Sequence, residues 1–241
     1  MGFACWLASN LNTSLLPIGN PLKSQSFTAL SIGTMKTIIL LSDAKSGPPC
    51  HLAEAIESLG CKCKLASSPD LSAFDAGDLL IIDRCSFIVP SRVWQSFELS
   101  VNCHPSMLPL HRGAHPLLWA PLFQDPVGVT IHTVSKSVDM GLHLYQSELP
   151  YSDLNTFRQL HLASRELIAI SIYRLVGDYL SKRLTFAKVS YDSHEYHHRN
   201  AFSNSLLDML PMRWDTSIGE AREMLSQHIF EYRNCIGQSS Q

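Results

Sequence analysis

Apolar residues recur along the chain at two spacings, which predict alternating strands and helices. Residues 78–83 are almost continuously apolar, as is typical of a central strand in a parallel sheet. Residues 51–59 instead place Leu52, Ile56 and Leu59 at helical spacing, and Gly60 ends this predicted helix. The predicted strands are 35–41, 61–66, 78–83, 99–102, 127–134 and 142–149, and the predicted helices are 51–59, 93–98, 156–180 and 220–232.

This alternation, with short links, predicts an α/β fold with a Rossmann-like, mostly parallel, doubly wound sheet. Ligands of such sheets bind beyond the carboxyl ends of the strands. We expect a catalytic domain over residues 35–183 and a small tail or subdomain over 184–241. Residues 1–34 contain no acidic residue and no Arg, and are rich in Ser, Asn, Leu and Pro. We predict that they form a disordered extension, with Met35 as an alternative natural start.

Composition narrows the class of protein. The chain has 241 residues, 45% hydrophobic and 17% charged, and a formal net charge of −2, so no basic surface argues for nucleic acid. No apolar run approaches the length of a membrane span, and we expect a cytoplasmic protein. The seven cysteines form no C-x-x-C pair and predict reduced thiols. The histidines are scattered, so no metal site is expected, and the densest cluster, Tyr196 to Arg199, is predicted to be a surface loop.

An amide, an imidazole and a carboxylate each follow a predicted strand. Asn102 and His104 lie two residues apart, and Asp139 precedes Met140-Gly141. Asn102 could donate an N–H to a tetrahedral oxyanion, His104 could carry a proton, and Asp139 could fix the tautomer of the imidazole. Each residue alone has an ordinary explanation, such as a turn or a satisfied core histidine. As an ordered set they favour acyl transfer between nitrogens.

Three motifs carry a resemblance to a known family: N-x-H-P-S-x-L-P-x-x-R-G, then G-V-T-I-H, then D-x-G. In this order and at these distances they resemble the folate-dependent formyltransferases, over roughly residues 37–180. The resemblance implies 10-formyltetrahydrofolate as the donor co-substrate, a primary amine as the acceptor, and no metal. It assigns the catalytic roles to Asn102, His104 and Asp139.

The same resemblance implies a pteridine pocket. Ser86, Phe87 and Ile88 would line it, partly through backbone groups, and the loop of residues 134–139, including Val138, would form its other wall. The stretch before Asp139 departs from the family, whose members usually have acidic residues and a glycine there; this chain has Ser-Lys-Ser-Val.

The identity of the acceptor is less constrained. Residues 42–49 lack the Gly-Ser-Asn phosphate loop of the purine-synthesis transformylases, and the 58 residues after Arg183 are too few for the basic tRNA-binding domain of methionyl-tRNA formyltransferases. Residues 212–217 resemble a G-W-D-T-P motif of sugar N-formyltransferases. This favours a nucleotide-activated amino-deoxy sugar, such as dTDP-4-amino-4,6-dideoxyglucose. The alternatives are a glycinamide ribonucleotide or other amine formyltransferase, a formyltetrahydrofolate hydrolase, and a non-catalytic nucleotide-sugar-binding member. A homodimer is possible, because small members of the family commonly dimerise.

Aromatic residues and further histidines surround the first motif. Trp119 and Phe123 are predicted to lie in the core. His111 and His115 are predicted to face the substrate or the surface, and for His132 a place near the site and a place in the core are equally favoured.

Overall fold

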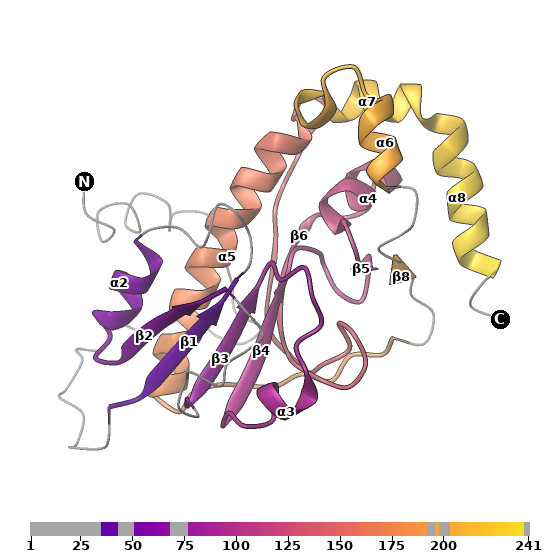
Figure 1. The fold of residues 1–241 in the computed structure, drawn as a ribbon. Helices are drawn as coiled ribbons and strands as arrows, with labels where there is room; N and C mark the ends of the chain where they lie inside the picture. The colour runs from indigo at the N-terminus through magenta and orange to yellow at the C-terminus, as the bar shows by residue number, and fades with distance from the viewer. Residues whose placement is uncertain (1–34, 43–50, 68–76, 192–195, 198–202, 239–241) are drawn as a thin grey trace. The chain divides into compact units, whose positions relative to one another are not determined.

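The computed structural model describes residues 35–42, 51–67, 77–191, 196–197 and 203–238 (Figure 1). The predicted extension of residues 1–34 lies outside the described residues. The strands are β1 (Thr37–Leu41), β2 (Lys62–Ala66), β3 (Leu79–Asp83), β4 (Leu99–His104), β5 (Arg112–Gly113), β6 (Gly128–Thr133), β7 (His143–Glu148) and β8 (Tyr196–His197). The helices are α2 (Leu52–Glu57), α3 (Ser91–Trp94), α4 (Pro116–Phe123), α5 (Phe157–Leu180), α6 (Ser203–Met209), α7 (Ile218–Met224) and α8 (Ser226–Gln238), with a 3₁₀ turn, η2 (Arg213–Asp215).

The strands confirm the predicted α/β class. Six of them have the order β2-β1-β3-β4-β6-β7, and a separate pair joins β5 to β8 in parallel. The chain divides into two compact units: unit 1 is Met1–Val101 with Ala169–Leu184, and unit 2 is Asn102–Ile168 with Thr185–Gln241. The tail therefore belongs to the same unit as the segment that carries the three motifs.

Unit 1 is built on β1, which pairs in parallel with β2 on one side and β3 on the other. All five residues of β3 are buried, as the unbroken apolar run predicts. Before β1, the Lys36 ammonium donates to the carboxylates of Asp78 (2.6 Å) and Glu98 (2.7 Å). Tyr179 donates its hydroxyl to the same Glu98 carboxylate (2.9 Å), so this ionic cluster links separate segments of the unit.

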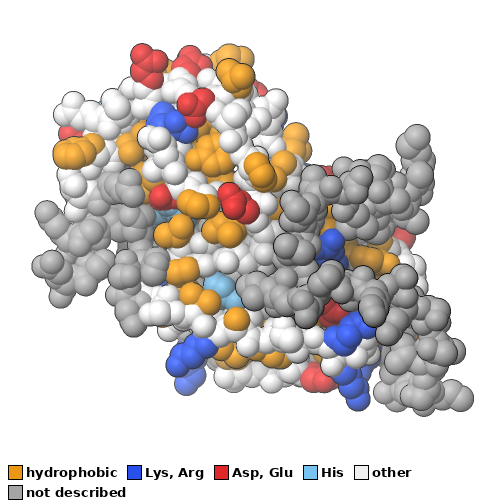
Figure 2. Space-filling model, turned by 180° about the vertical axis from the view of Figure 1, so that it is seen from behind, with side chains coloured by type: hydrophobic (Ala, Val, Ile, Leu, Met, Phe, Trp, Pro, Cys, Tyr) orange, Lys and Arg blue, Asp and Glu red, His pale blue; other side chains and the backbone are white. Residues whose placement is uncertain are grey.

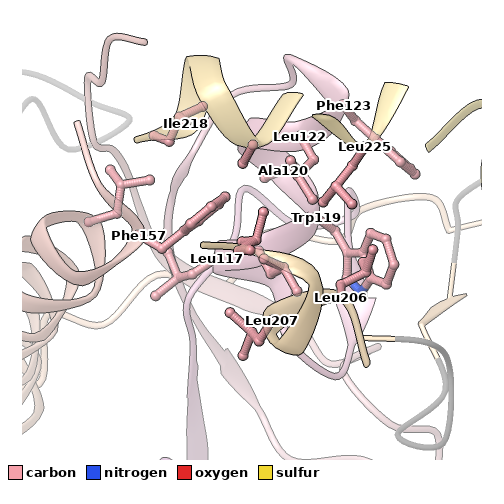
Figure 3. Close-up of a cluster of buried hydrophobic side chains, with 14 of the residues drawn as sticks. Leu117, Trp119, Ala120, Leu122, Phe123, Phe157, Leu206, Leu207, Ile218 and Leu225 are labelled. Carbon is pink, nitrogen blue, oxygen red and sulfur yellow. The ribbon is translucent and has the colours of Figure 1, made fainter. Parts of the chain in front are cut away.

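Unit 2 has its apolar core around α4, whose eight residues are all buried. Trp119 and Phe123 are 1% and 5% exposed, which confirms their predicted place in the core. Figure 3 shows side chains of α4, α6 and α7 converging with Phe157 on one cluster. A helix that is apolar on every side has to be enclosed, and here α6, α7 and the start of α5 enclose it. The tail therefore supplies much of the core of this unit.

Two helix predictions were wrong. The predicted helix of residues 220–232 is interrupted, since α7 ends at Met224 and α8 begins at Ser226. The predicted helix of residues 93–98 instead begins at Ser91, directly after Pro90, and ends at Trp94. Helix α4 was not predicted because its continuous apolar run has no helical period and contains Pro121.

The surface resembles that of an ordinary globular chain. In the described part of the chain, no helix is both long and apolar enough to cross a membrane. On the face drawn in Figure 2, Lys and Arg side chains stand in separate groups rather than in one continuous patch.

Candidate active site

Strand β4 presents Asn102 and His104 on one side, because alternate residues of a strand point the same way. His104 is 4% exposed, whereas Asn102 is half-buried. The two side chains therefore lie next to each other, with the amide nearer to solvent.

A turn between β6 and β7 brings Asp139 back to the end of β4. Asp139 has a left-handed backbone (φ 53°), and the chain then passes so close to β6 that a Cβ at Gly141 would lie 1.7 Å from the Thr133 carbonyl oxygen. Only glycine fits at that crossing. The Thr133 N–H donates to the Leu142 carbonyl (2.8 Å), and the Leu142 N–H donates to Thr133 Oγ1 (2.9 Å), which closes the turn.

The Asp139 carboxylate lies within reach of four groups. One oxygen, Oδ2, accepts from the Gly113 N–H (3.0 Å) and lies 3.5 Å from His104 Nδ1. The other, Oδ1, accepts from Asn102 Nδ2 (3.3 Å) and lies 3.6 Å from His132 Nε2. We call Asn102, His104, His132 and Asp139 the Asp139 group. The structure therefore brings together the three residues predicted as catalytic, although Asp139 is 35 positions beyond His104.

His132 completes the Asp139 group and lies at the site that the sequence left open for it. Its Nδ1 is 2.9 Å from the Thr133 carbonyl oxygen and donates to it, so Nε2 points toward Asn102 and Asp139. Asn102 Nδ2 is 3.2 Å from that Nε2. The Asn102 amide is thus held by two partners, and it would have to release one of them to present an N–H to a substrate oxygen.

The electrostatics of the group separate a charged acid from a buried base. Burial alone would raise the pKa of Asp139, but its interactions with His104, His132 and the Gly113 N–H outweigh burial and lower the pKa to about 2. Burial lowers the pKa of His104, and Asp139 and the His111 carbonyl oppose that change. The pair therefore consists of a firmly ionised carboxylate and an imidazole that can gain and release a proton.

The second nitrogen of His104 is also held. His104 Nε2 lies 3.0 Å from the backbone carbonyl oxygen of His111. With Asp139 on Nδ1 and a carbonyl on Nε2, the ring is fixed between two acceptors, and protonation of the ring satisfies both at once.

Four histidine interpretations need correction or completion. His111 and His197 are 1% and 0% exposed, so the predictions of a substrate-facing or surface His111 and of a surface loop at His197 were wrong. The His197 ring stacks on Trp119 and on the His111 ring in the core of unit 2. His198 lies outside the described residues. His143 is 6% exposed, and its Nε2 is bonded to the Tyr191 hydroxyl (2.8 Å).

Three of the four residues predicted to contact folate are exposed, and the fourth is half-buried. In unit 1, Ser86, Phe87 and Ile88 follow the carboxyl end of β3; Ile88 is 81% exposed, Ser86 is exposed and Phe87 is half-buried. In unit 2, Val138 is 40% exposed beside Asp139. Their contact with folate stays a prediction.

The last glycine of the first motif also contacts the candidate site. Gly113 (φ 90°) supplies the backbone N–H that binds Asp139, and a Cβ there would lie 2.3 Å from the His197 carbonyl oxygen. Among the residues that the structure describes, no group of three His, Cys, Asp or Glu side chains could hold a metal ion.

Comparisons with known proteins agree with this geometry. Residues 62–172 match the sequence model of a family described as formyl transferase. A methionyl-tRNA formyltransferase of Streptococcus pneumoniae serotype 19F is 30% identical over 112 residues, which cover 44% of this chain and 36% of that protein. The chain thus spans little more than a third of the length of this curated relative.

Solved structures share the fold at lower identity. The formyltransferase PseJ of Anoxybacillus kamchatkensis, solved in complex with UDP-4,6-dideoxy-4-formamido-L-AltNAc and tetrahydrofolate, is similar with a TM-score of 0.64 and 23% identity, over 77% of this chain and 99% of that chain. A 4-N formyltransferase of Francisella tularensis has a TM-score of 0.61 and 18% identity, over 80% and 88% of the two chains.

Proposed function

Because this chain belongs to the formyl transferase family, we propose that it moves a formyl group from 10-formyltetrahydrofolate to the amine of a nucleotide-activated amino-deoxy sugar. The observation that carries the proposal is the Asp139 group, in which Asp139 contacts both Asn102 (3.3 Å) and His104 (3.5 Å). These three residue types are the ones that formyl transfer between two nitrogens needs.

The proposed chemistry forms one C–N bond and breaks another. The acceptor nitrogen attacks the formyl carbon, and the formyl oxygen becomes an oxyanion to which Asn102 donates an N–H. A positioned donor of this kind contributes roughly 3 kcal/mol to the transition state. When the tetrahedral intermediate collapses, the bond from carbon to the folate nitrogen breaks.

His104 and Asp139 account for the proton that moves during the transfer. The amine loses one proton and the folate nitrogen gains one, so the transfer needs a group that accepts and returns a proton. His104 performs this role, and the Asp139 carboxylate stabilises the imidazolium in between. Ser86, Phe87, Ile88 and Val138 would contact the folate ring through their exposed apolar and backbone surfaces.

Structural similarity and the tail support a sugar acceptor. By structure, the chain covers 99% of PseJ, whose complex contains a UDP-linked formamido sugar, and 75% of a methionyl-tRNA formyltransferase of Clostridium thermocellum. The W-D-T motif of the tail, residues 214–216, makes several hydrogen bonds. Arg158 donates two hydrogen bonds to the Asp215 carboxylate, and Thr216 Oγ1 accepts one from the Met212 N–H (3.1 Å). A motif whose side chains are held in place in this way suits recognition of a small substrate.

The test is a panel of acceptors. The purified chain is given 10-formyltetrahydrofolate with UDP-, dTDP- or GDP-linked amino-deoxyhexoses, glycinamide ribonucleotide or methionyl-tRNA, and the released tetrahydrofolate and the formylated product are measured. We expect turnover with one of the sugars, and a loss of at least a hundredfold in His104→Ala. The control is His51→Ala, which removes an exposed imidazole from unit 1.

Each other outcome identifies a different function. Turnover of glycinamide ribonucleotide or methionyl-tRNA without any sugar would overturn the proposed acceptor. Release of tetrahydrofolate without acceptor would indicate a hydrolase. A chain that does not bind the folate at all would be a non-catalytic member of the family.

A further inference from the structure

A second buried polar chain in unit 2 leads from the tail to the backbone that holds His104. Asp125 Oδ2 lies 3.0 Å from His111 Nε2, and His111 Nδ1 lies 3.0 Å from His197 Nε2. His197 Nδ1 then lies 3.2 Å from the Tyr232 hydroxyl. We call His111, His197, Tyr232 and Trp119, which stacks on two of them, the His197 group.

The carboxylate fixes the direction of the first hydrogen bond in this chain, and neutral rings give the direction of the others. A carboxylate only accepts, so His111 Nε2 donates to Asp125 and His111 Nδ1 is left as an acceptor. His197 Nε2 therefore donates to His111, and His197 Nδ1 accepts from the Tyr232 hydroxyl. His197 is satisfied in the neutral form, which suits its burial, since burial lowers the pKa of His197 to about 3.

Aromatic stacking fixes the position of the rings as well. The Trp119 ring lies 5.1 Å from the His197 ring and 4.2 Å from the Tyr232 ring, at angles of 8° and 17° between the planes. The tail residues thus lie flat on a core residue of α4. A side chain held by stacking and by two hydrogen bonds has one accessible position.

The backbone beside His197 is tied to the same segment. Strand β8 (Tyr196–His197) pairs with β5 (Arg112–Gly113), and the Ala114 N–H donates to the His197 carbonyl (2.8 Å). The segment it holds is unusual, because His111, Gly113 and His115 all have positive φ (53°, 90° and 58°). Such a backbone persists only where its surroundings enforce it.

This segment contacts both members of the predicted proton-transfer pair. The His111 carbonyl accepts from His104 Nε2, and the Gly113 N–H donates to Asp139 Oδ2, each at 3.0 Å. The link from His197 to His104 passes through a backbone carbonyl, which has no exchangeable proton. The His197 group therefore cannot relay protons to His104 and can only fix its place.

We propose that His197 and Tyr232 are positioning residues for formyl transfer, which hold the His111–Gly113 backbone against His104 and Asp139. This inference rests on the proposed function. Both residues lie outside residues 62–172, the part that matches the family, so the tail of this chain completes a site whose other residues the family segment supplies.

The decisive variant is His197→Phe, which retains a flat ring on Trp119 but removes both hydrogen bonds. We expect kcat to fall at least tenfold, with KM values for folate and acceptor changed less than threefold, because substrate contacts are kept while the geometry of His104 is loosened. His197→Gln, whose amide can still donate to His111, should recover kcat to within about threefold of the wild type. Tyr232→Phe removes only the last donor and should lower kcat two- to fivefold.

Folding and activity are separated by a second readout. In protein labelled with ¹⁵N-histidine, the His104 signals, assigned with His104→Gln, should show a hydrogen-bonded Nε2–H in the wild type and in His197→Gln, and lose it in His197→Phe. This measurement needs no substrate, so it tests the inference even if no acceptor in the panel is turned over. If His197→Phe does not fold, Tyr232→Phe and His197→Gln provide the same comparison.

The control variant is Tyr151→Phe, which removes a hydroxyl donated to the Asp125 carbonyl (3.3 Å) but leaves the Asp125 carboxylate on His111. It should leave both kcat and the His104 signals unchanged. The inference is overturned if His197→Phe folds with unchanged His104 signals, or if kcat falls in His197→Gln as far as in His197→Phe.

Discussion

The Asp139 group and the His197 group each contain two histidines, yet the surroundings of the rings differ. In the Asp139 group, both imidazoles lie within 3.6 Å of one carboxylate that is 10% exposed. In the His197 group, the rings bond to each other and stack on or tilt against the aromatic rings of Trp119 and Phe123. A shared carboxylate suits a ring that changes its charge, whereas the bonds of His197 to a second imidazole and to a hydroxyl suit a ring that stays neutral.

The comparison shows that burial alone does not reveal the role of a histidine. His104 and His197 are 4% and 0% exposed, and burial lowers the pKa of both. What separates them is the partner of Nδ1, which is the Asp139 carboxylate for His104 and the Tyr232 hydroxyl for His197. We expect substitutions to change rate in the first group and geometry in the second.

The largest effect should come from the carboxylate of the Asp139 group. Asp139→Asn keeps the shape of the side chain but removes the charge that stabilises the His104 imidazolium, so kcat should fall at least a hundredfold, about 3 kcal/mol or more in activation free energy. Steady-state kinetics with the acceptor found in the panel measures this. If the Asp139→Asn variant unfolds, or keeps wild-type kcat, the carboxylate serves structure alone.

A change at Gly113 should affect both groups at once. Gly113→Ala places a Cβ 2.3 Å from the His197 carbonyl at a φ of 90°, so we expect a loss of roughly 2 to 3 kcal/mol in the free energy of unfolding and a lower kcat. Urea denaturation measures the first quantity. The matched control is Gly177→Ala in α5, where a Cβ meets nothing within 4 Å and helix propensity favours alanine by roughly 0.5 to 1 kcal/mol. Equal destabilisation by both variants would contradict the prediction.

Acid should weaken the fold through buried neutral histidines. Burial lowers the pKa of His143 to about 4 and that of His197 to about 3, from 6.5. The unfolded chain therefore binds more protons below pH 6.5, and stability that is complete above this pH is lost as the pH falls toward these values. We expect a loss of roughly 1 to 2 kcal/mol for each ring between pH 6.5 and 5.

The measurement is the free energy of unfolding at pH 7, 6 and 5. Asp139 acts in the same direction, because folding lowers its pKa too, but a pKa of about 2 confines its effect to pH below about 4. His143→Gln removes one of these rings, so the free energy of unfolding should fall less between pH 7 and pH 5. A slope that does not change in this variant would mean that His143 is protonated in the folded protein.

The smallest predicted effect lies in the tail, away from both groups. Ser217 caps α7 by accepting from the Glu220 N–H (3.3 Å), so Ser217→Ala should cost about 1 kcal/mol of stability without changing kcat. Ser217→Asp keeps an acceptor at the same place and should be close to neutral. A loss of kcat in Ser217→Ala would extend the positioning role beyond the His197 group.

Much of the fold was predictable because local patterns determine it. Apolar strands such as β3 and the spacing of Leu52 and Ile56 depend on neighbours in the sequence, and their elements are present. Helix α4 escaped prediction because its burial comes from α6 and α7, far along the chain, and leaves no polar face to give a period.

The residues of the candidate site also differ in how far the sequence alone identifies them. Asn102, His104 and Asp139 belong to recognisable sequence motifs. His197 instead follows Tyr196 in a polar stretch whose sequence is typical of a surface loop. The burial of His197 depends on Trp119 and on the carboxylate of Asp125 beyond His111, which no local pattern connects to it. The motifs that carry the candidate catalytic residues can therefore be recognised in the sequence, while the residues proposed to position them become visible only in three dimensions.

The acceptor that faces His104 Nε2 belongs to the main chain of His111. It is therefore present whatever amino acid occupies position 111, and no exchange of side chains can erase it; an exchange can only shift it. A mutational scan of this protein would pass over that oxygen, and its importance would surface instead as unexplained sensitivity at distant tail positions.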